Sequence, residues 1–285
     1  MARMASPAEF ECDDAAGEQA RAGGMSTAYK LEIRTVQSST IKTLVEALKE
    51  LLTDTVLEVD PGGIKIIATD MAHVVLVNLK LYADRFEYFH CPQELRIGIN
   101  MLNMHKLIKT IGNSDTLTLY VEEDDDNHLG IKIESNEKNT KSIYKLDLLA
   151  LPPQSIRVGP TEFDSVIVIS ATDFQKLCRD MHNIAETVEI RAVKNEVVFR
   201  CKGDFCSQET VLCNHGGADG DGGMDHGSEI TQGIFSLKYL LMFTRCTNLS
   251  NTVELFLKND MPCILRYAVS TLGDIKLVCA PQVVD

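Results

Sequence analysis

Residues 98–119 read GINMLNMHKLIKTIGNSDTLTL, and residues 234–255 read IFSLKYLLMFTRCTNLSNTVEL. Aligned at an offset of 136 positions, the two stretches pair Lys109 with Arg245 and Leu117 with Val253. Each begins with apolar residues at helical spacing and ends in an alternating, strand-like run. The chain therefore contains an internal duplication, which has to be recognised before the fold is assigned.

A second repeat precedes each of these stretches. Apolar residues follow one stripe of a helix over residues 39–52, and the same spacing returns over 172–184. Each helix is followed by two strand-like runs, TVLEVDPGGIKIIATD at 55–70 and TVEIRAVKNEVVFRCKGD at 187–204. Four short amphipathic helices are thus expected, over 39–52, 100–111, 172–184 and 236–247. We predict an α+β fold of two similar domains, each an antiparallel sheet with two helices packed on one face.

The connections between the strands argue against a parallel α/β fold. They are mostly the length of hairpins, whereas parallel strands need longer crossovers that are usually helical. Between the halves, residues 148–163 (LLALPPQSIRVGPTEF) carry three prolines and no helical period, which is typical of an extended connector. We expect a flexible N-terminal tail, a first domain, a connector and a second domain, over residues 1–24, 25–147, 148–163 and 164–285.

The composition is that of a globular protein with reduced cysteines. Of the 285 residues 45% are hydrophobic and 24% are charged, and no apolar run reaches the ~18 to 20 residues of a membrane helix. Residues 1–24 contain no apolar signal segment and carry a net charge of −3. The nine cysteines form no C-x-x-C pair, and most lie in apolar runs, as expected in a cytosolic or nuclear protein.

Two clusters of potential metal ligands have unsuitable spacing. A zinc site from Cys201, Cys206, Cys213 and His215 would leave four and six residues between successive cysteines, which is poor for zinc. The glycine-rich segment 214–229 contains aspartates but lacks the spacing and terminal glutamate of an EF-hand. We expect no metal and no cofactor, and interpret 214–229 and the acidic run 122–126 as hairpin loops.

Positive charge is concentrated on the four predicted helices, although the chain as a whole carries −13. These helices hold eight bases against four acids, a net of +4, so the remainder carries −17. In each helix the two bases are three or seven residues apart, which places both on one face. The bases are Lys42, Lys49, Lys106, Lys109, Lys176, Arg179, Lys238 and Arg245.

Such helix faces suit contacts to nucleic-acid phosphates. No glycine-rich motif, arginine-rich arm or aromatic stacking platform accompanies the bases, so the contact would not depend on base sequence. About eight bases, partly offset by acids, would not hold DNA tightly at cellular salt. Several copies closed into a ring would solve this problem, because an encircled duplex slides without being released. The residues suggest such a ring without establishing it.

Six separate segments, in the same order, resemble the proliferating cell nuclear antigen family of DNA sliding clamps. The resemblance covers about residues 29–283 and rests on LVEALKELL, ATDMAHVVLV, LRIGINMLNMHKLIK, FQKLCRDMHNI, KYLLMFTRCTNLSNTVEL and LGDIKLVCAPQV. It implies a homotrimeric ring whose helices line a hole around duplex DNA. It also implies a nuclear, non-catalytic processivity factor in replication and repair that binds DNA polymerase, a clamp loader and other proteins.

The resemblance assigns two sets of site residues. The eight helix bases occupy or neighbour the positions that face DNA in the family. A groove under the connector receives short peptides through an aromatic and aliphatic plug, and corresponds to His73, Val74, Leu76, Ile156, Val158, Pro262, Ala280 and Pro281. Apolar residues beside an extended connector suit such a partner. Thr69 replaces a common methionine and Val278 a common tyrosine, so the preferred peptide would differ from the usual one.

The resemblance assigns further positions, and two alternative functions stand beside it. Subunit contacts in the family pair edge strands, which correspond to about residues 140–147 and 205–213. Lys194 matches a lysine used for ubiquitin attachment, although its VKNE surroundings suit an ordinary surface lysine equally well. One alternative function is a subunit of a heteromeric checkpoint clamp. Another, a cysteine hydrolase using His73 or His105, is disfavoured because no nucleophile lies in a recognisable turn.

Overall fold

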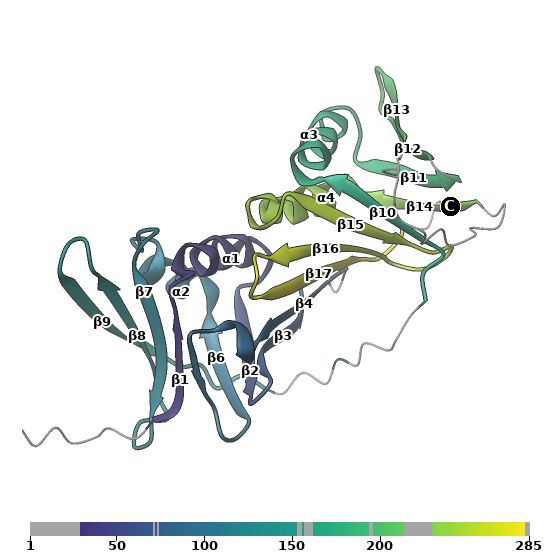
Figure 1. The fold of residues 1–285 in the computed structure, drawn as a ribbon. Coiled ribbons are helices and arrows are strands. Elements are labelled where there is room, and N and C mark those ends of the chain that lie inside the picture. The colour runs from purple at the N-terminus through teal and green to yellow at the C-terminus, as the bar shows by residue number, and fades with distance from the viewer. Residues whose placement is uncertain are drawn as a thin grey trace, which may run out of the picture.

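The computed structural model describes residues 29–70, 72, 74–152, 156, 162–193, 196–213 and 230–282. Within these residues the chain forms three antiparallel sheets, with the helices in a row along one side of them (Figure 1). This arrangement confirms the predicted α+β class. It also places the repeated helices of both halves on the same side of the molecule.

Strands that follow one another in the sequence do not always belong to the same sheet. The first sheet, in the order β5-β1-β7-β8-β9, contains β1 (Tyr29–Thr35), β5 (Tyr88–His90), β7 (Thr116–Glu122), β8 (His128–Ser135) and β9 (Thr140–Asp147). The second, in the order β10-β15-β16-β17-β4-β3-β2-β6, contains β2 (Asp54–Asp60), β3 (Gly63–Thr69), β4 (Val75–Tyr82), β6 (Leu95–Asn100), β10 (Ser165–Ser170), β15 (Thr252–Leu257), β16 (Cys263–Val269) and β17 (Gly273–Cys279). The third, in the order β13-β12-β11-β14, contains β11 (Thr187–Val193), β12 (Glu196–Lys202), β13 (Ser207–Cys213) and β14 (Thr231–Ser236).

The amphipathic helices form close to their predicted positions. They are α1 (Ser38–Leu51), α2 (Met101–Ile108), α3 (Ala171–His182) and α4 (Leu237–Phe243), with short 3-10 segments η1 (Ala83–Arg85) and η2 (Thr244–Leu249). The last helix is shorter than the predicted 236–247, so Arg245 lies on η2. The Thr244 hydroxyl donates to Leu241 O at 2.7 Å, a local bond that competes with a regular helix. None of the described helices is long and apolar enough to cross a membrane.

Each helix buries its apolar stripe against the sheets. On α1 the buried residues include Ile41, Leu44 and Leu48, and on α3 they include Phe174 and Met181. Burial of each such side chain stabilises the fold by roughly 1.5–3 kcal/mol. Because these residues occupy one face, the basic residues between them are left on the side of the helix turned away from the sheets.

The two halves share one continuous sheet, which the sequence repeat did not predict. β17 of the second half pairs with β4 of the first half, from Gly273 opposite Leu81 to Cys279 opposite Val75. The residues of this ladder that face the core, such as Val77, Ile275 and Leu277, are completely buried. The shared sheet therefore joins the halves directly, in addition to the connector, and holds their helices in one layer.

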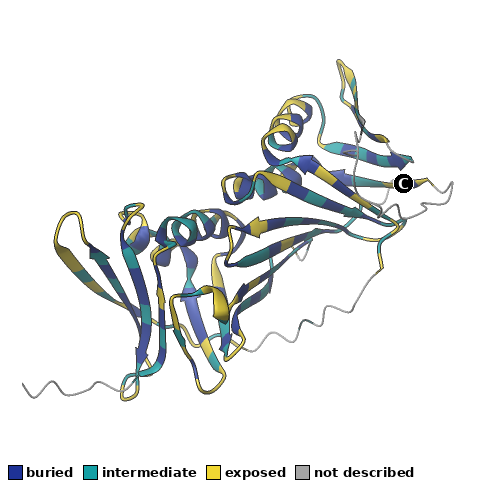
Figure 2. Cartoon of the chain, viewed as in Figure 1, coloured by how far each residue is buried: buried dark blue, intermediate teal, exposed yellow. Residues whose placement is uncertain are grey.

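β9 and β13 lie at the outer edges of the first and third sheets. Each pairs with a single neighbour, β8 or β12, so one row of its backbone groups faces away from the sheet. Ile143 on β9 is 54% exposed and Val211 on β13 is 44% exposed. Figure 2 shows that exposed residues mark both outer hairpins. These two edges coincide with the strands that the resemblance assigned to subunit contacts.

The acidic run 122–126 forms the turn between β7 and β8, as predicted. Lys145 Nζ lies 2.9 Å from Glu122 Oε2 and 3.3 Å from Asp125 Oδ2, and His128 Nδ1 lies 2.8 Å from Asp125 Oδ1. The hydrogen bond from His128 lowers the pKa of Asp125 to about 2. Local cations therefore neutralise part of this acidic turn.

Candidate nucleic-acid interface and partner groove

The structure brings the eight predicted bases into one layer of helices. α1 packs against α2, α3 packs against α4, and η2 lies against both α1 and α3. Figure 1 shows the row α2, α1, α4, α3 above the sheets. The two bases of α1 are half-buried, and the other six are exposed: Lys106, Lys109, Lys176, Arg179, Lys238 and Arg245. Rigid elements therefore carry all eight charges.

The bases of α1 make contacts within the protein. Lys42 Nζ donates to Ile111 O at 3.1 Å, and Lys49 Nζ lies 2.8 Å from Glu50 Oε1. The hydrogen bond from Lys49 is the main reason why the pKa of Glu50 is lowered, against the opposing effect of burial. The charge of Arg245 lowers it further, so the second half acts electrostatically on the first.

His105 on α2 responds to the same group of cations. Burial lowers its pKa, and the charges of Lys49 and Lys109 lower it further, while nearby glutamates act in the opposite direction. Lys49 and Lys109 thus both lower the pKa of His105, and Arg245 on η2 lowers the pKa of Glu50. We call α1, α2 and η2 the cationic region. Sequence periodicity did not single out His105 as part of it, because a histidine within a helix is not distinctive.

The helix bases of the second half are exposed, and in the described part of the chain they form no ion pair with a carboxylate. The ion pairs found among the described residues involve none of Lys176, Arg179, Lys238 and Arg245. Lys238 Nζ lies 5.6 Å from the centroid of the Tyr239 ring, a weak cation–π contact. These side chains therefore remain accessible to an external anion such as a phosphate.

The structure also brings together three predicted groove residues. The carboxylate of Asp70 accepts a hydrogen bond from the Val74 amide at 2.9 Å, which links the residue after β3 to the residue before β4. Ala280 N donates to Val74 O at 3.2 Å, so the residue after β17 is held beside the residue before β4. Leu76 follows on the same face of β4 and is half-buried. Strand ends far apart in sequence thus form one apolar surface.

A row of cross-strand partners forms the floor of this surface. The row crosses β3, β4, β17 and β16 and consists of the half-buried residues Thr69, Leu76, Val278 and Ile264. Their neighbours in each strand are buried toward the helices, so the row lies on the opposite, outer face of the sheet. Pro262 precedes β16 and Pro281 follows β17, at the same end. Ile264 was missed, since its only signal is the period of two in CILRYAV.

The remaining predicted groove residues are only partly placed. Ile156 is half-buried, and its neighbours 153–155 and 157–161 lie outside the described residues. His73, Val158 and Lys194 also lie outside the described residues. The groove is therefore defined by its floor and by the ends of β4, β16 and β17.

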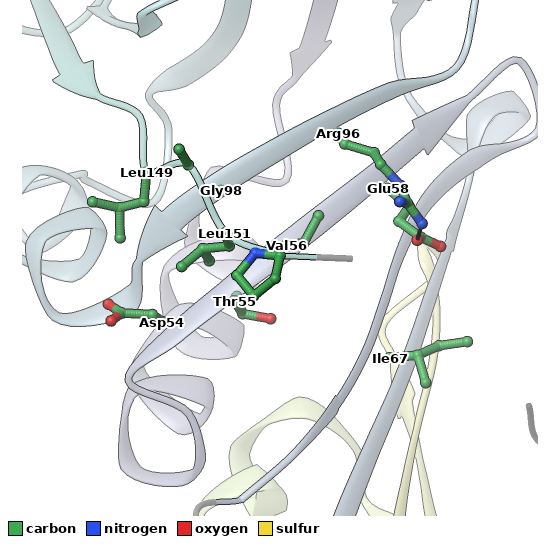
Figure 3. Close-up of a pocket in the computed structure, with 11 residues that line it drawn as sticks. Asp54, Thr55, Val56, Glu58, Ile67, Arg96, Gly98, Leu149 and Leu151 are labelled. Carbon is green, nitrogen blue, oxygen red and sulfur yellow. Dashed lines mark hydrogen bonds and ion pairs between the residues drawn. The ribbon is translucent and has the colours of Figure 1, made fainter. Parts of the chain in front are cut away.

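A cavity of about 460 Å³ lies on the same outer face, where the connector begins (Figure 3). Leu149 N donates to Gly98 O at 2.8 Å, which holds the start of the connector against β6. A Cβ atom added to Gly98 would lie 2.1 Å from Leu149 O, so this crossing requires glycine. Arg96 Nη2 lies 2.7 Å from Glu58 Oε1 across the cavity wall. The cavity thus marks the point at which the connector is anchored to the first half.

Burial suppresses the reactivity of two of the buried thiols, Cys178 and Cys246. It raises the pKa of Cys178 and of Cys246 to about 12, so both stay protonated at neutral pH. Within the described part of the chain, no three histidine, cysteine or acidic side chains are grouped to hold a metal ion. Of the poorly spaced zinc candidates, His215 and the side chain of Cys213 lie outside that part.

Comparisons with known proteins identify the class of this arrangement. The family model described as the N-terminal domain of proliferating cell nuclear antigen matches residues 30–155, and that of the C-terminal domain matches 157–282. A relative from Paramecium bursaria Chlorella virus 1, described as a probable DNA polymerase sliding clamp 1, is 38% identical over 255 residues, which cover 87% of this chain and 95% of the relative. The fold is that of a two-domain clamp. The chain belongs to the proliferating cell nuclear antigen family, which confirms the resemblance.

Proposed function

We propose that this chain is a DNA sliding clamp, a homotrimeric ring that encircles duplex DNA and tethers DNA polymerase without catalysis of its own. The observation that carries the proposal is the single layer of helices bearing eight bases on a protein of net charge −13. Family membership supports the same function, as does the description of the viral relative as a polymerase sliding clamp.

The outer edges of β9 and β13 would join neighbouring subunits. Antiparallel pairing of the two edges would satisfy their outward backbone groups and cover Ile143 and Val211. Because the two edges differ, the contact is head-to-tail, and such contacts generate a ring when the rotation between subunits closes. In the trimer, the layers of helices would face a central hole.

DNA in this hole would meet cations on rigid helices and no base-reading group. The contact would be made to phosphates and would allow sliding. It would weaken with added salt, because binding releases counterions from the DNA and this release becomes less favourable as the salt concentration rises. Acidic surface elsewhere would repel the duplex and leave the hole as the only attractive place. The ring therefore supplies by topology the retention that a weak contact lacks.

The outer-face groove would hold short peptides of DNA polymerase, the clamp loader and repair proteins. Its aliphatic floor suits an aromatic or aliphatic anchor, and Val74, held by a hydrogen bond to Asp70, lies at one end of it. Thr69 and Val278 would adjust peptide preference, because both contribute to the floor. We place the protein at sites of DNA replication or in the nucleus, with Lys194 as a site of ubiquitin attachment.

The test combines oligomeric mass with topological retention on DNA. Light scattering during size exclusion should give three times the 31.6 kDa chain mass for the purified protein alone. After threading onto bead-tethered linear DNA, the ring should remain when the free end is blocked and escape when it is open. A monomer that assembles only with other chains would favour the heteromeric clamp instead.

A charge-reversal variant separates DNA contact from assembly. Lys109→Glu with Arg245→Glu should lower the processivity of the polymerase while leaving the trimeric mass intact, because both side chains are exposed on the helix layer. Unchanged processivity in a trimeric variant would contradict the assigned DNA-facing side.

A further inference from the structure

Two buried thiols face each other beneath the groove. Cys263, the first residue of β16, is directly opposite Cys279, the last residue of β17. Both are completely buried and both are reduced. Directly opposed residues of an antiparallel pair have Cα atoms about 4.5–5.5 Å apart, within the range of about 4.4–6.8 Å that disulfides span. The Cα separation of such a pair is therefore compatible with a disulfide.

The surroundings give the two thiols different chemical character. Burial raises the pKa of Cys263, and its hydrogen bond with Cys279 raises it further. The same hydrogen bond lowers the pKa of Cys279, against the effect of burial, and the backbone N–H of Ser236 contributes in the same direction. Of the two thiols, Cys279 is therefore the one whose pKa is lowered, and its S–H also donates to Ala280 O at 3.6 Å.

We propose that Cys263 and Cys279 are a redox-sensitive pair that forms a reversible intrachain disulfide with hydrogen peroxide and thereby weakens peptide binding in the adjacent groove. The formation of the disulfide stands on the geometry of β16 and β17 alone. Its effect on peptide binding rests on the proposed function, because it requires the groove to bind peptides.

The chemistry needs peroxide as the oxidant and proceeds in two balanced steps. The Cys279 thiolate attacks one peroxide oxygen and the O–O bond breaks, which gives a sulfenic acid and a hydroxide ion. The hydroxide takes one proton from solvent and becomes water. The Cys263 sulfur then attacks the sulfenic sulfur, the S–O bond breaks, and the thiol proton leaves with the hydroxide as a second water. Two thiols and one peroxide thus give one disulfide and two waters, and a dithiol reductant reverses the change.

The position of the pair at a strand end offers a route for the oxidant. Cys263 and Cys279 are the terminal partners of the β16–β17 ladder, and Cys279 is also the last partner of Val75 on β4. Ladder ends open locally at lower free energy than ladder centres. Hydrogen peroxide is small enough to enter through such an opening, whereas the cysteines of α3 and η2 lie within packed helices.

The same position connects the pair to the groove. Pro262 precedes Cys263, and Ala280 follows Cys279 and donates its N–H to Val74 O at 3.2 Å. Bonding brings the two sulfurs from hydrogen-bond contact to about 2.05 Å, so the backbone on both sides of the pair must shift. That shift moves Pro262 and Ala280, which lie at one end of the groove, relative to Val74.

The experiment uses the full chain with the exposed Cys206 replaced by serine, so that its surface thiol does not react. The protein is treated with hydrogen peroxide, digested without reduction, and searched by mass spectrometry for the crosslink between Cys263 and Cys279. In parallel, fluorescence anisotropy measures the Kd of a fluorescein-labelled peptide with aromatic and aliphatic anchors. We expect the crosslink and a rise in Kd of about threefold to tenfold, both reversed by dithiothreitol.

Matched variants distinguish the possible outcomes. Cys263→Ala and Cys279→Ala should each abolish the crosslink and the peroxide effect on Kd, whereas Cys246→Ala, at an equally buried thiol without an opposed partner, should change neither. Absence of the crosslink in the folded protein would overturn the proposal, and a crosslink without a change in Kd would overturn its regulatory part. If the peptide failed to bind the reduced protein, that result would contradict the proposed groove. The mass spectrum would still show whether the disulfide between Cys263 and Cys279 forms.

Discussion

The first helix of each half, α1 or α3, carries two bases, and the two helices use their bases differently. On α1, Lys42 is hydrogen-bonded to Ile111 O and Lys49 is paired with Glu50, whereas Lys176 and Arg179 on α3 are exposed. The first pair therefore contributes to the local structure, and the second pair is available to a ligand. The comparison teaches that the two helices share an apolar stripe and two bases, while the positions and the local partners of those bases differ.

The largest effect is expected at the two edges, one from each half, that would meet between subunits. Val211→Asp on β13 and Ile143→Asp on β9 should each reduce the mass from three chains to one, because an unpaired carboxylate buried in an interface costs several kcal/mol. Light scattering measures the change. Val168→Asp is the matched control, since Val168 is 53% exposed on β10, away from both edges, and should leave the trimer intact.

The next effect concerns DNA binding and the difference between the halves. Arg179→Ala with Arg245→Ala should lower the affinity for duplex DNA more than Lys42→Ala with Lys49→Ala, because the first two side chains are exposed and the last two are engaged. Loss of two phosphate contacts should reduce the slope of log affinity against log salt by about 2. Binding isotherms at several salt concentrations would show this, and equal losses in the two double variants would contradict the comparison.

A smaller effect is expected on the free energy of unfolding, at Lys42 of α1 and not at Lys176 of α3. Lys42→Ala should lower the free energy of unfolding by about 0.5–1.5 kcal/mol, because it removes a hydrogen bond to the Ile111 carbonyl. Lys176→Ala should stay within about 0.5 kcal/mol of the parent, as is usual for an exposed position. Urea denaturation compares the two, and an unaffected Lys42→Ala protein would show that the bond contributes nothing.

The smallest effect is a pH dependence set by His105. Its pKa in the folded state is lowered from 6.5, first by burial and then by Lys49 and Lys109, so the unfolded chain takes up the proton first as the pH falls. The free energy of unfolding is therefore unaffected by His105 above pH 6.5, where the imidazole is neutral in both states. It decreases as the pH falls through 6.5 toward the folded-state pKa, because the unfolded chain then binds more protons. His105→Gln should remove this part of the acid-side decline in urea denaturation. By NMR titration, Lys109→Ala should raise the pKa of His105, and no change would contradict the cationic region.

Local features of the fold were predictable because they depend on short stretches of sequence. The apolar stripes of α1 and α3, the hairpin β2–β3 and the hairpin β11–β12 follow from periods of 3.6 and 2 residues. The basic faces of the helices follow from the same spacing. The end of α4 was not predictable in this way, because the chain tightens into the 3-10 segment η2 after Phe243, a change that the spacing of apolar residues does not reveal.

The candidate groove was predictable only through the family resemblance, and only in part. Val74, Leu76 and Ala280 belong to strand ends that are about 200 residues apart, and no local pattern indicates that they meet. The structure adds Ile264 to the floor, since the register of β16 and β17 places it opposite Val278. It also shows that the opposed cysteines lie directly behind this floor, a relation that cysteine spacing alone does not contain.

By itself, the amino-acid sequence determined the duplication, the helices and strands of each half, and the concentration of positive charge on the helices. These features depend on residue type and periodicity, which are properties of neighbouring residues. Only the tertiary structure decided that β4 and β17 join the halves into one sheet, that β9 and β13 remain as unpaired edges, and that α1 and η2 share an electrostatic environment. Pairings between distant strands are selected by the packing of the whole core, in which many segments of similar pattern compete for the same neighbours.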